Sequence, residues 1–531
     1  MLRVTNLRVA LDNDASLKKI AAKRLQIPLQ AVLEVVIVRK ALDARRKHNI
    51  NFVYSLDVRT SLPAGQTAGK FRNDRDVALV PELKPQPIIP GSKPLDSQPV
   101  VVGLGPAGMF AALMLAKQGY HPLVLERGRD VDCRTRAVAD FWRSGNFDAA
   151  TNVQFGEGGA GTFSDGKLTT RVQDPRMGEV LDILVEAGAP PEIRYEHKPH
   201  IGTDKLRTVV KNIRNRILAL GGQVEFEARV TDVKIKDGSL QGLVINENRY
   251  IPCQAALFGI GHSARDTYEM LYRRGIAMEA KPFAIGVRIE HPQELIDKAQ
   301  YGPVAGHKKL GRADYALVYH DKARGRTAYS FCMCPGGLVV AAASEAGGVV
   351  TNGMSLYDRA SGIANSALVV NVNPADCGRD VLSGIDFQRQ YEQLAYQYGG
   401  SNYYAPVQTA GDFLAGTSGS KDFLTPPSYQ PGFTAVDLHH CLPAFVTGTL
   451  AAALPDFDRK IKGFSHKQAV MTGVETRTSA PVRLVRTEQY LSVNTAGFYP
   501  IGEGAGYAGG IMSAALDGLN AAIAIITEYK P

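Results

Sequence analysis

The first 75 residues alternate between apolar and polar positions in a way that predicts a small α/β unit. Leu2–Leu11, Leu33–Arg39 and Asn51–Arg59 each show the two-residue period of a half-buried strand. Asn13–Asp14 can cap a helix that runs over Ser16–Leu25. The order strand, helix, strand, strand predicts a domain of its own.

A second pattern begins at Pro99 and predicts a βαβ unit. Pro99–Gly103 is a short apolar strand, Met109–Gln118 is a helix rich in Ala and Leu, and His121–Leu125 is a second strand. Two parallel strands joined by a helix are typical of nucleotide-binding sheets.

The turn between this first strand and its helix carries glycines in GxGxxG spacing, at Gly103, Gly105 and Gly108. This spacing lets the chain turn tightly, lets the backbone approach a pyrophosphate, and lets helix and strand pack closely. Glu126 follows Gly108 by 18 residues, where a carboxylate can bind a ribose. We therefore expect a dinucleotide to be bound by Gly103, Gly105, Pro106, Ala107, Gly108, Glu126 and Arg127.

The end of the chain predicts another strand, glycine loop and helix, over Gly497–Ile501, Gly502–Gly510 and Ile511–Tyr529. This segment resembles the second FAD fingerprint of two-motif flavoproteins of the glutathione-reductase and hydroxylase type. The resemblance implies that Glu503 binds the ribityl chain. It also implies that the loop and the helix N-terminus face the flavin, through Gly502, Gly509, Gly510 and Ile511.

A meander of short strands over residues 223–251 runs into the sequence Gly259-Ile-Gly-His-Ser-Ala264. This strand end resembles the Ala-Thr-Gly strand of the same flavoproteins, which implies that Gly261 lies near the cofactor. The same residues also fit GxGxxA, so a separate NADPH-binding fold is the alternative, with Glu290 as its ribose acid. Glu290 follows Ala264 by 26 residues, which is a long spacing for that role.

The most distinctive stretch is Asn152–Leu168, which contains five glycines together with Thr162, Ser164 and Lys167. A loop this open can lie against a flavin ring and offer N–H and hydroxyl donors. We expect Gly156–Lys167 to line the ring, with direct contacts from Gly158, Gly159, Gly161, Thr162 and Lys167.

This loop, the GxGPAG turn, GHSARDTYEML, FCMCPGG and GEGAGYAGGIMSAALDGLNAA together resemble the bacterial and plastid FAD-dependent dehydrogenase proteins. The resemblance covers nearly the whole chain, including a small domain before the FAD-binding fold. More distant kin are aromatic-ring hydroxylase-like flavoproteins and FAD-dependent tRNA-modifying enzymes. The family implies FAD as the cofactor but no settled substrate.

These patterns predict an α/β fold with three parts. A small basic α/β domain is expected over 1–80, and a Pro-rich linker with six prolines over 81–99. The main part is a discontinuous two-motif FAD-binding Rossmann domain with an inserted mixed α/β substrate region, or cap. The expected boundaries are 100–171, 203–280 and 490–531 for the Rossmann domain, and 172–202 and 281–489 for the cap.

Three charged side chains are candidates for chemistry beside the flavin. Lys167 can stabilise the negative charge of a reduced flavin, or it simply pairs with Asp165 or another acid. His262 can donate a proton, or it hydrogen-bonds its own loop. Arg288 can anchor an anion or the flavin edge, or it forms a surface salt bridge.

Cys332 and Cys334 share one face of a predicted strand and could exchange a disulfide with substrate or flavin. A bridge between them would be strained against ordinary disulfide geometry, and small buried thiols are the alternative. The His and Cys spacings match no metal-ligand pattern, so we predict no metal site.

Apolar residues make up 45% and charged residues 21% of the 531, values that exclude disordered and collagen-like classes. No stretch approaches the ~18 uninterrupted apolar residues of a membrane helix. The six cysteines form no disulfide framework, which predicts reduced thiols and a cytoplasmic protein.

The charge is unevenly placed, because residues 1–96 carry 17 Lys and Arg against 9 Asp and Glu, or +8 of the total +9. A basic module favours a polyanion partner such as nucleic acid, an anionic membrane or an acidic protein, or it is only a solvated surface.

We expect a FAD-dependent oxidoreductase that passes a hydride or an electron pair between flavin and a small organic substrate, with NAD(P)H as a candidate electron donor. Two alternatives stay open. One is a FAD-dependent RNA-modifying enzyme that uses the basic N-terminal domain and Cys332 or Cys334. The other is a non-catalytic flavin-binding sensor.

Overall fold

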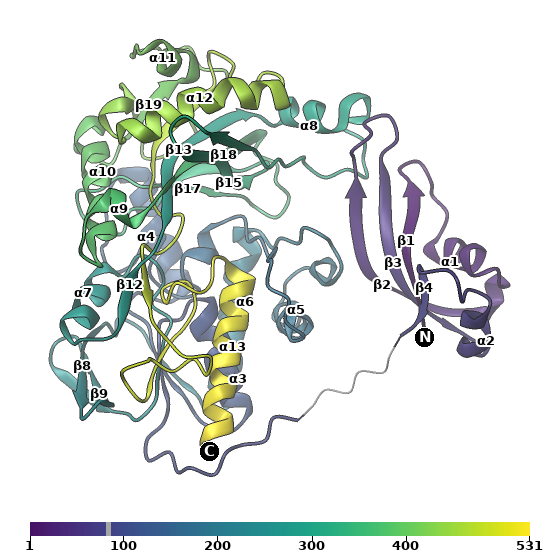
Figure 1. The fold of residues 1–531 in the computed structure, drawn as a ribbon, viewed down its shortest axis with the longest axis horizontal. Helices are drawn as coiled ribbons and strands as arrows, with labels where there is room; N and C mark the ends of the chain where they lie inside the picture. The colour runs from purple at the N-terminus through teal and green to yellow at the C-terminus, as the bar shows by residue number, and fades with distance from the viewer. Residues whose placement is uncertain (81–86) are drawn as a thin grey trace.

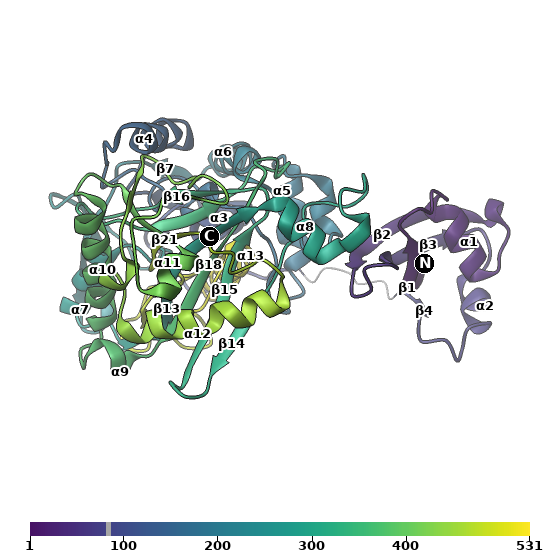
Figure 2. The ribbon, with the colours of Figure 1, turned by 90° about the horizontal axis from the view of Figure 1, so that it is seen from above.

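A computed structural model describes residues 1–80 and 87–531, as a small N-terminal domain beside a larger body (Figures 1 and 2). The expected linker falls between the two, and its residues 81–86 lie outside the described residues. Its far end is bound to the larger body, because Gly91 N donates to Ile526 O over 2.8 Å.

The N-terminal domain is a four-stranded antiparallel sheet in the order β2-β3-β1-β4. Its elements are β1 Leu2–Ala10, α1 Leu17–Leu25, β2 Val32–Asp43, β3 Asn51–Thr60, α2 Ala64–Gly69 and β4 Val77–Leu79. The predicted helix is capped by Ser16, which accepts from Lys19 N, and not by Asn13–Asp14. Leu25 and Leu56 lie in the small core that α1 covers.

The edge strand β2 joins this domain to the body through main-chain hydrogen bonds. Lys40 N donates to Tyr195 O over 2.7 Å, and His197 N donates to Lys40 O over 2.8 Å. The Lys40 ammonium also pairs with Glu196 at 2.7 Å. The basic domain is therefore docked by strand pairing and not only by its linker.

The Rossmann domain is built on a five-stranded parallel sheet in the order β23-β11-β5-β6-β7. Its strands are β5 Val100–Val102, β6 Leu123–Leu125, β7 Gln223–Glu225, β11 Ala256–Phe258 and β23 Phe498–Pro500. All three expected segments of the discontinuous domain thus contribute strands to one sheet.

Helices cover one face of this sheet and a small meander covers the other. The helices are α3 Pro106–Lys117, α4 Val131–Ser144, α5 Met177–Glu186, α6 Thr203–Ala219 and α13 Ile511–Glu528, whereas α7 Arg265–Arg273 packs with the meander on the other face. The meander strands are β8 Val230–Lys236, β9 Ser239–Ile245 and β10 Arg249–Pro252. Figure 1 shows α3, α6 and α13 in one layer, where α3 contacts both of the others.

One helix, α5, lies in another domain than expected, and another, α13, has an unusually apolar composition. α5 packs against α13 in the core of the Rossmann domain, although residues 172–202 were assigned to the cap. α13 is long and apolar enough to cross a membrane, with a mean hydropathy of 1.3. Since 56% of it is buried in the protein, packing in this core accounts for its apolar composition.

The cap is a seven-stranded mixed sheet in the order β14-β15-β18-β13-β21-β19-β20. Its strands are β13 Phe283–Pro292, β14 Val318–Asp321, β15 Arg326–Cys334, β18 Ile363–Val372, β19 Ala405–Thr409, β20 Phe433–Ala435 and β21 Val470–Glu475. The smaller pairs are β12 Met278–Ala280 with β22 Val482–Leu484, and β16 Leu338–Ala341 with β17 Thr351–Met354. Its helices are α8 Gln293–Tyr301, α9 Pro374–Cys377, α10 Ser383–Gly399, α11 Ala410–Ala415 and α12 Ala444–Lys460.

This topology contradicts a second nucleotide fold at Gly259–Ala264. β11 belongs to the same parallel sheet as β5, and β13 runs antiparallel to β18 and β21 in the cap. Glu290 is therefore in another sheet, where its carboxylate accepts from Ser428, and it cannot close a βαβ unit with β11.

Candidate functional site

A cavity of about 380 Å³ lies at the carboxyl ends of β5, β11 and β23, between the Rossmann domain and the cap. Ligands of open parallel sheets bind at this edge, and the volume lies in the range of small-molecule sites. Most of the predicted cofactor residues line it, namely Gly103, Gly105, Pro106, Ala107, Glu126, Arg127, Gly159, Gly161, Lys167, Gly261, Gly502, Glu503, Gly509, Gly510 and Ile511.

The GxGxxG turn forms one side of the cavity. Gly103 has a φ of +93°, and a Cβ there would overlap the Gly259 carbonyl. A Cβ at Gly108 would overlap the Gly103 carbonyl, so Gly108 packs below the turn and does not line the cavity. Gly105 is the N-cap of α3, and no side chain caps this helix. Its free N–H groups and positive dipole end are therefore available to an anion in the cavity.

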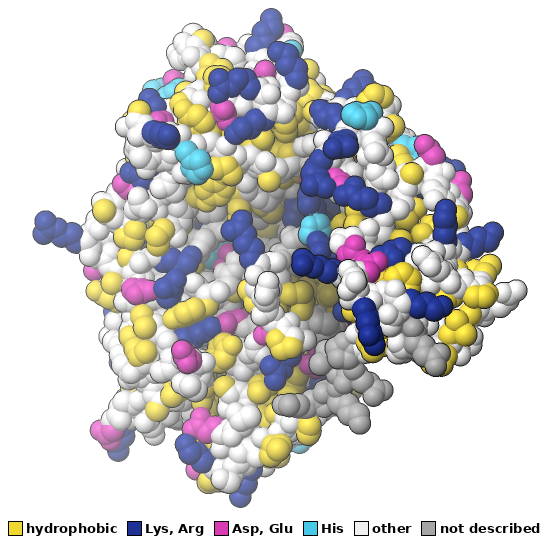
Figure 3. Space-filling view, turned by 45° about the vertical axis from the view of Figure 1, so that its right-hand side comes forward, with side chains coloured by type: hydrophobic (Ala, Val, Ile, Leu, Met, Phe, Trp, Pro, Cys, Tyr) yellow, Lys and Arg dark blue, Asp and Glu magenta, His cyan; other side chains and the backbone are white. Residues whose placement is uncertain are grey.

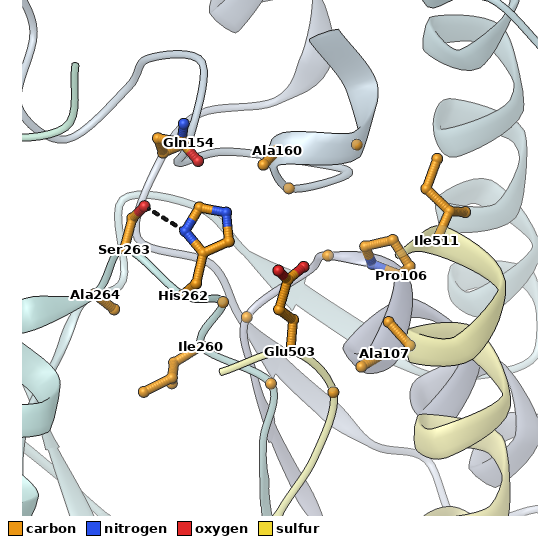
Figure 4. Close-up of a pocket in the computed structure, with 18 of the residues that line it drawn as sticks. Pro106, Ala107, Gln154, Ala160, Ile260, His262, Ser263, Ala264, Glu503 and Ile511 are labelled. Carbon is orange, nitrogen blue, oxygen red and sulfur yellow. Dashed lines mark hydrogen bonds between the residues drawn. The ribbon is translucent and has the colours of Figure 1, made fainter. Parts of the chain in front are cut away.

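The C-terminal loop forms the adjoining side, and Figure 4 shows Glu503 pointing into the cavity beside Pro106 and His262. Burial raises the pKa of Glu503 to about 7, although Lys281 lies near enough to lower it. Within the described part of the chain, this carboxylate accepts no hydrogen bond. Gly510 is the N-cap of α13, again without a capping side chain, and it opens onto free space.

Glu126 organises the loops around the turn. Its carboxylate accepts from Leu104 N at 2.8 Å, Gly128 N at 2.9 Å and Gly156 N at 3.0 Å. It also lines the cavity, and its binding of a ribose stays a prediction. Glu126 thus ties the first motif to the 152–168 loop.

The 152–168 loop is held by a residue that the sequence did not single out. Arg134 on α4 is fully buried and donates to the carbonyls of Asn152, Val153, Gly156, Glu157 and Gly159. Gly159 and Gly161 are thereby placed against the turn at Gly105 and Pro106. Gly158 and Thr162 line a separate small cavity behind the loop and not the main one.

Cys332 enters the cavity wall from the cap. The pairing of β15 with β18 shifts by one residue between Phe331 and Cys334, and Cys332 has a φ of +44°. This bulge breaks the regular alternation that placed both cysteines on one strand face. Cys332 lines the cavity, whereas Cys334 is buried behind it.

Lys167 reaches this bulge from the opposite side. Its ammonium donates to Met333 O and lies 3.3 Å from the Asp165 carboxylate, the pairing that was the alternative expectation. Burial would lower the pKa of Lys167, but the neighbouring cysteines and the Asp165 carboxylate raise it. Lys167 is therefore a cation in the cavity wall, with 30% of its side chain exposed.

Arg288 is neither a surface salt bridge nor part of the cavity wall. Its guanidinium is fully buried and binds Glu475 through two hydrogen bonds, at 3.0 and 3.1 Å. It also donates to the Cys332 carbonyl at 3.0 Å. Because Glu475 and Cys332 both line the cavity, Arg288 positions that wall from behind.

His262 belongs to a buried network that joins the two domains. Burial, together with Arg477 and Arg265, lowers the pKa of His262 to about 3, so the ring is neutral at pH 7. Its Nδ1 lies 2.8 Å from Ser263 Oγ, to which Arg477 donates over 2.9 Å. Arg477 and Arg265 both bind the Glu392 carboxylate of α10. His262 thus bonds its own loop, which was the alternative to a proton donor.

The site fits the chemistry of FAD on three observations. Two uncapped helix N-termini, at Gly105 and Gly510, face one cavity, and each favours negative charge. Gly261, with open space around its Cα, offers bare backbone to a ligand. Glu503 points its carboxylate into the cavity, where it can accept hydrogen bonds from hydroxyl groups of a ligand.

Comparison with known proteins agrees with this fit. Residues 282–478 match the family described as FAD-dependent protein, C-terminal domain-like, and residues 1–59 match a family described as a domain of unknown function. An uncharacterized protein of Clostridium beijerinckii is 49% identical over 530 residues, which cover 99% of each chain. Our chain belongs to the family of that clostridial protein. The domain matched in the cap is FAD-dependent by description, and FAD is the cofactor of this flavoprotein.

Solved structures resemble the chain more loosely. The flavin-dependent brominase Bmp2 is 12% identical with a TM-score of 0.36, and the match covers 80% of this chain and 78% of that one. CtdE in complex with FAD is also 12% identical, with a TM-score of 0.31 and coverage of 80% and 83%.

Proposed function

We propose that this flavoprotein is a FAD-dependent oxidoreductase of the dehydrogenase or reductase type, acting on a small organic substrate. The observation that supports the proposal is that the Rossmann domain and the cap line one cavity with different chemical groups. The Rossmann side offers helix N-termini and bare glycine backbone, the cap side offers Cys332 and Glu475, and Lys167 of the 152–168 loop lies against the cap residues. A cofactor held on the first side leaves the second for a substrate.

The chain's own residues would bind the cofactor, orient it and shield it from water. The backbone N–H groups of Gly105 and Ala107 at the start of α3 would hold the pyrophosphate, Glu126 the adenosine ribose, and Glu503 the ribityl chain. Bound FAD supplies the two-electron chemistry. The cap covers the cavity, and the buried Arg265–Glu392–Arg477 network keeps it in register with the Rossmann domain.

Lys167 gives the substrate side a fixed positive charge. A cation there favours negative charge that develops during reduction, and the low dielectric of a covered site strengthens the effect. The neutral His262 ring contributes a hydrogen bond and no net charge. The free thiols of all six cysteines are compatible with the cytoplasmic location that we propose.

Anaerobic mixing tests the proposal. Purified protein with bound FAD is mixed with NADH or NADPH, and bleaching of the flavin absorbance is followed by stopped flow. We expect one of the two nucleotides to reduce the flavin, and candidate organic oxidants to restore the oxidised spectrum. A bound flavin that no nucleotide or organic donor reduces would contradict the proposal and favour a sensor.

A second candidate, an RNA-modifying enzyme, has one observation in its favour. Lys and Arg side chains gather along the hollow between the small domain and the body (Figure 3). Arg45, Arg46 and Lys47 are exposed between β2 and β3. We expect these charges to be a solvated surface. Binding of tRNA that falls steeply with salt, and is lost in R45E/R46E, would favour the RNA enzyme instead.

A further inference from the structure

The bulge at the end of β15 carries the only two cysteines that lie beside the cavity in the described chain. Bulges re-aim side chains and recur next to active sites. A non-glycine residue at positive φ is a strained conformation that its surroundings must hold. Cys332 has such a φ, at +44°, and its side chain lines the cavity.

Three donors fix this bulge, and two of them are cations. Arg288 donates to the Cys332 carbonyl at 3.0 Å, Lys167 donates to the Met333 carbonyl, and the Cys334 thiol donates to the Cys332 carbonyl at 3.3 Å. The same contacts that shape the backbone therefore surround the Cys332 sulfur with positive charge and with a second thiol.

The remaining cysteines are in different surroundings. Burial raises the pKa of Cys253 and Cys441 to about 12 and that of Cys377 to about 11. A hydrogen bond with Asp130 raises the pKa of Cys133. The pKa of Cys332 is lowered, first by the neighbouring Cys334 thiol and then by Lys167 and Arg288. A thiolate beside cations is the nucleophilic form of cysteine.

We infer that Cys332 and Cys334 form a redox-active dithiol that exchanges an electron pair with the bound flavin. This inference rests on the proposed function, because it takes the flavin as the oxidant. In the oxidising direction the Cys332 thiolate and the Cys334 thiol together lose two electrons and one proton, and an S–S bond forms. The electron pair and the proton pass to oxidised FAD, which becomes the anionic reduced flavin. The reverse step restores both sulfurs, and the strain expected of a bridge between such near neighbours makes that bridge easy to reduce.

The dithiol then serves as the electron relay between flavin and a substrate at the cap wall, and a substrate with a disulfide or another thiol-reactive group is the class that it fits. Cys332 is the sulfur that such a substrate reaches, since Cys334 lies behind it.

Counting thiols and electrons on the holoprotein tests the inference without a turnover assay. Protein with bound FAD is oxidised in air and unfolded in iodoacetamide, and the alkylated cysteines are counted by mass spectrometry. We expect four labelled residues, since two of the six cysteines are in the bridge, and six after reduction with dithionite. Anaerobic titration should consume two equivalents of dithionite per FAD, one for the flavin and one for the bridge.

Variants separate the pair from other thiols. C334S and C332S should keep FAD but consume one equivalent, whereas C377S, which removes a cysteine away from the cavity, should still consume two. Six labelled cysteines in the air-oxidised wild type, with one equivalent consumed, would overturn the dithiol and leave the proposed oxidoreductase intact. Failure of every nucleotide and organic donor to reduce the flavin would instead contradict the proposed function, whatever the thiol count.

Discussion

The two sides of the cavity are built in different ways. The Rossmann side lines the cavity mainly with main-chain groups, which come from glycine turns and from two helix N-termini at Gly105 and Gly510. The cap side uses charged side chains, which are fixed by buried partners such as Glu475 with Arg288 and Glu392 with Arg477. A site made of backbone groups tolerates any substitution that leaves space for the ligand. The stability of a buried charge, in contrast, depends on each of its charged partners.

The cap side should therefore be the fragile one, and E392Q should show the largest effect. Glu392 is the shared partner of Arg265 and Arg477, which are both buried. Neutralising it leaves two buried cations with too little negative charge, which costs about 3–5 kcal/mol. Urea unfolding of the holoprotein measures the loss.

The matched control is E294Q, whose carboxylate pairs with Lys298 on the surface of α8 and is 74% exposed. Surface pairs contribute about 0–1 kcal/mol. Equal unfolding midpoints for E392Q and E294Q would mean that the network does not hold the cap.

The Rossmann side also contains a buried carboxylate, Glu503, whose effect on stability can be compared with that of the cap charges. Its pKa rises from 4.5 to about 7 in the folded protein, because burial penalises the carboxylate. Between these values the folded state keeps a proton that the unfolded state releases, so stability falls as the pH rises from about 4.5 to 7. We expect apoprotein to lose about 1–3 kcal/mol over this window, and E503Q to lose correspondingly less.

Thermal unfolding of the two apoproteins at several pH values gives the difference directly. If the stability of wild type and of E503Q changes with pH in the same way, the Glu503 carboxylate is solvated and its pKa is not raised by burial.

The smallest effect is expected at Lys167, whose charge Asp165 partly neutralises at 3.3 Å. K167M removes a cation beside the flavin side of the wall and should lower the flavin reduction potential. A loss of ~1.4 kcal/mol corresponds to ~30 mV for a two-electron couple, and we expect a shift of that order or less.

Dye-coupled potentiometry measures this potential. K198M is the control, because Lys198 makes a comparable pair with Asp314 at 2.7 Å but does not line the cavity. An unchanged reduction potential in K167M would show that Lys167 is only a structural partner of Asp165 and Met333.

The same contrast explains what the sequence could predict. The glycine turn at Gly103–Gly108 and the loop at Gly502–Gly510 are contiguous, so their spacing is visible in the sequence. The elements around them were also predicted closely, as with the helix expected over Ile511–Tyr529 and found over Ile511–Glu528.

The cap side was not predictable in this way. Glu475 meets Arg288 only through the pairing of β21 with β13. Arg477 and Arg265 come together only because both bind Glu392 of α10. Arg134 orders the glycine loop from another helix, and no local pattern marks it. The bulge at Cys332 depends on pairing with β18, which a strand pattern alone does not contain.

The central claim is that the backbone at Gly105 holds the pyrophosphate of FAD, and G105V tests it most directly. Gly105 has a φ of −77°, and a Cβ there meets only Gly159 Cα at 3.7 Å, so the variant should fold. The added branches would occupy the space of the ligand. G311V is the control, because Gly311 is exposed and has nothing within 4 Å. FAD affinity, measured by fluorescence titration of the apoproteins, should fall at least tenfold in G105V, about 1.4 kcal/mol or more, and not in G311V. A folded G105V that binds FAD as tightly as wild type would contradict the account.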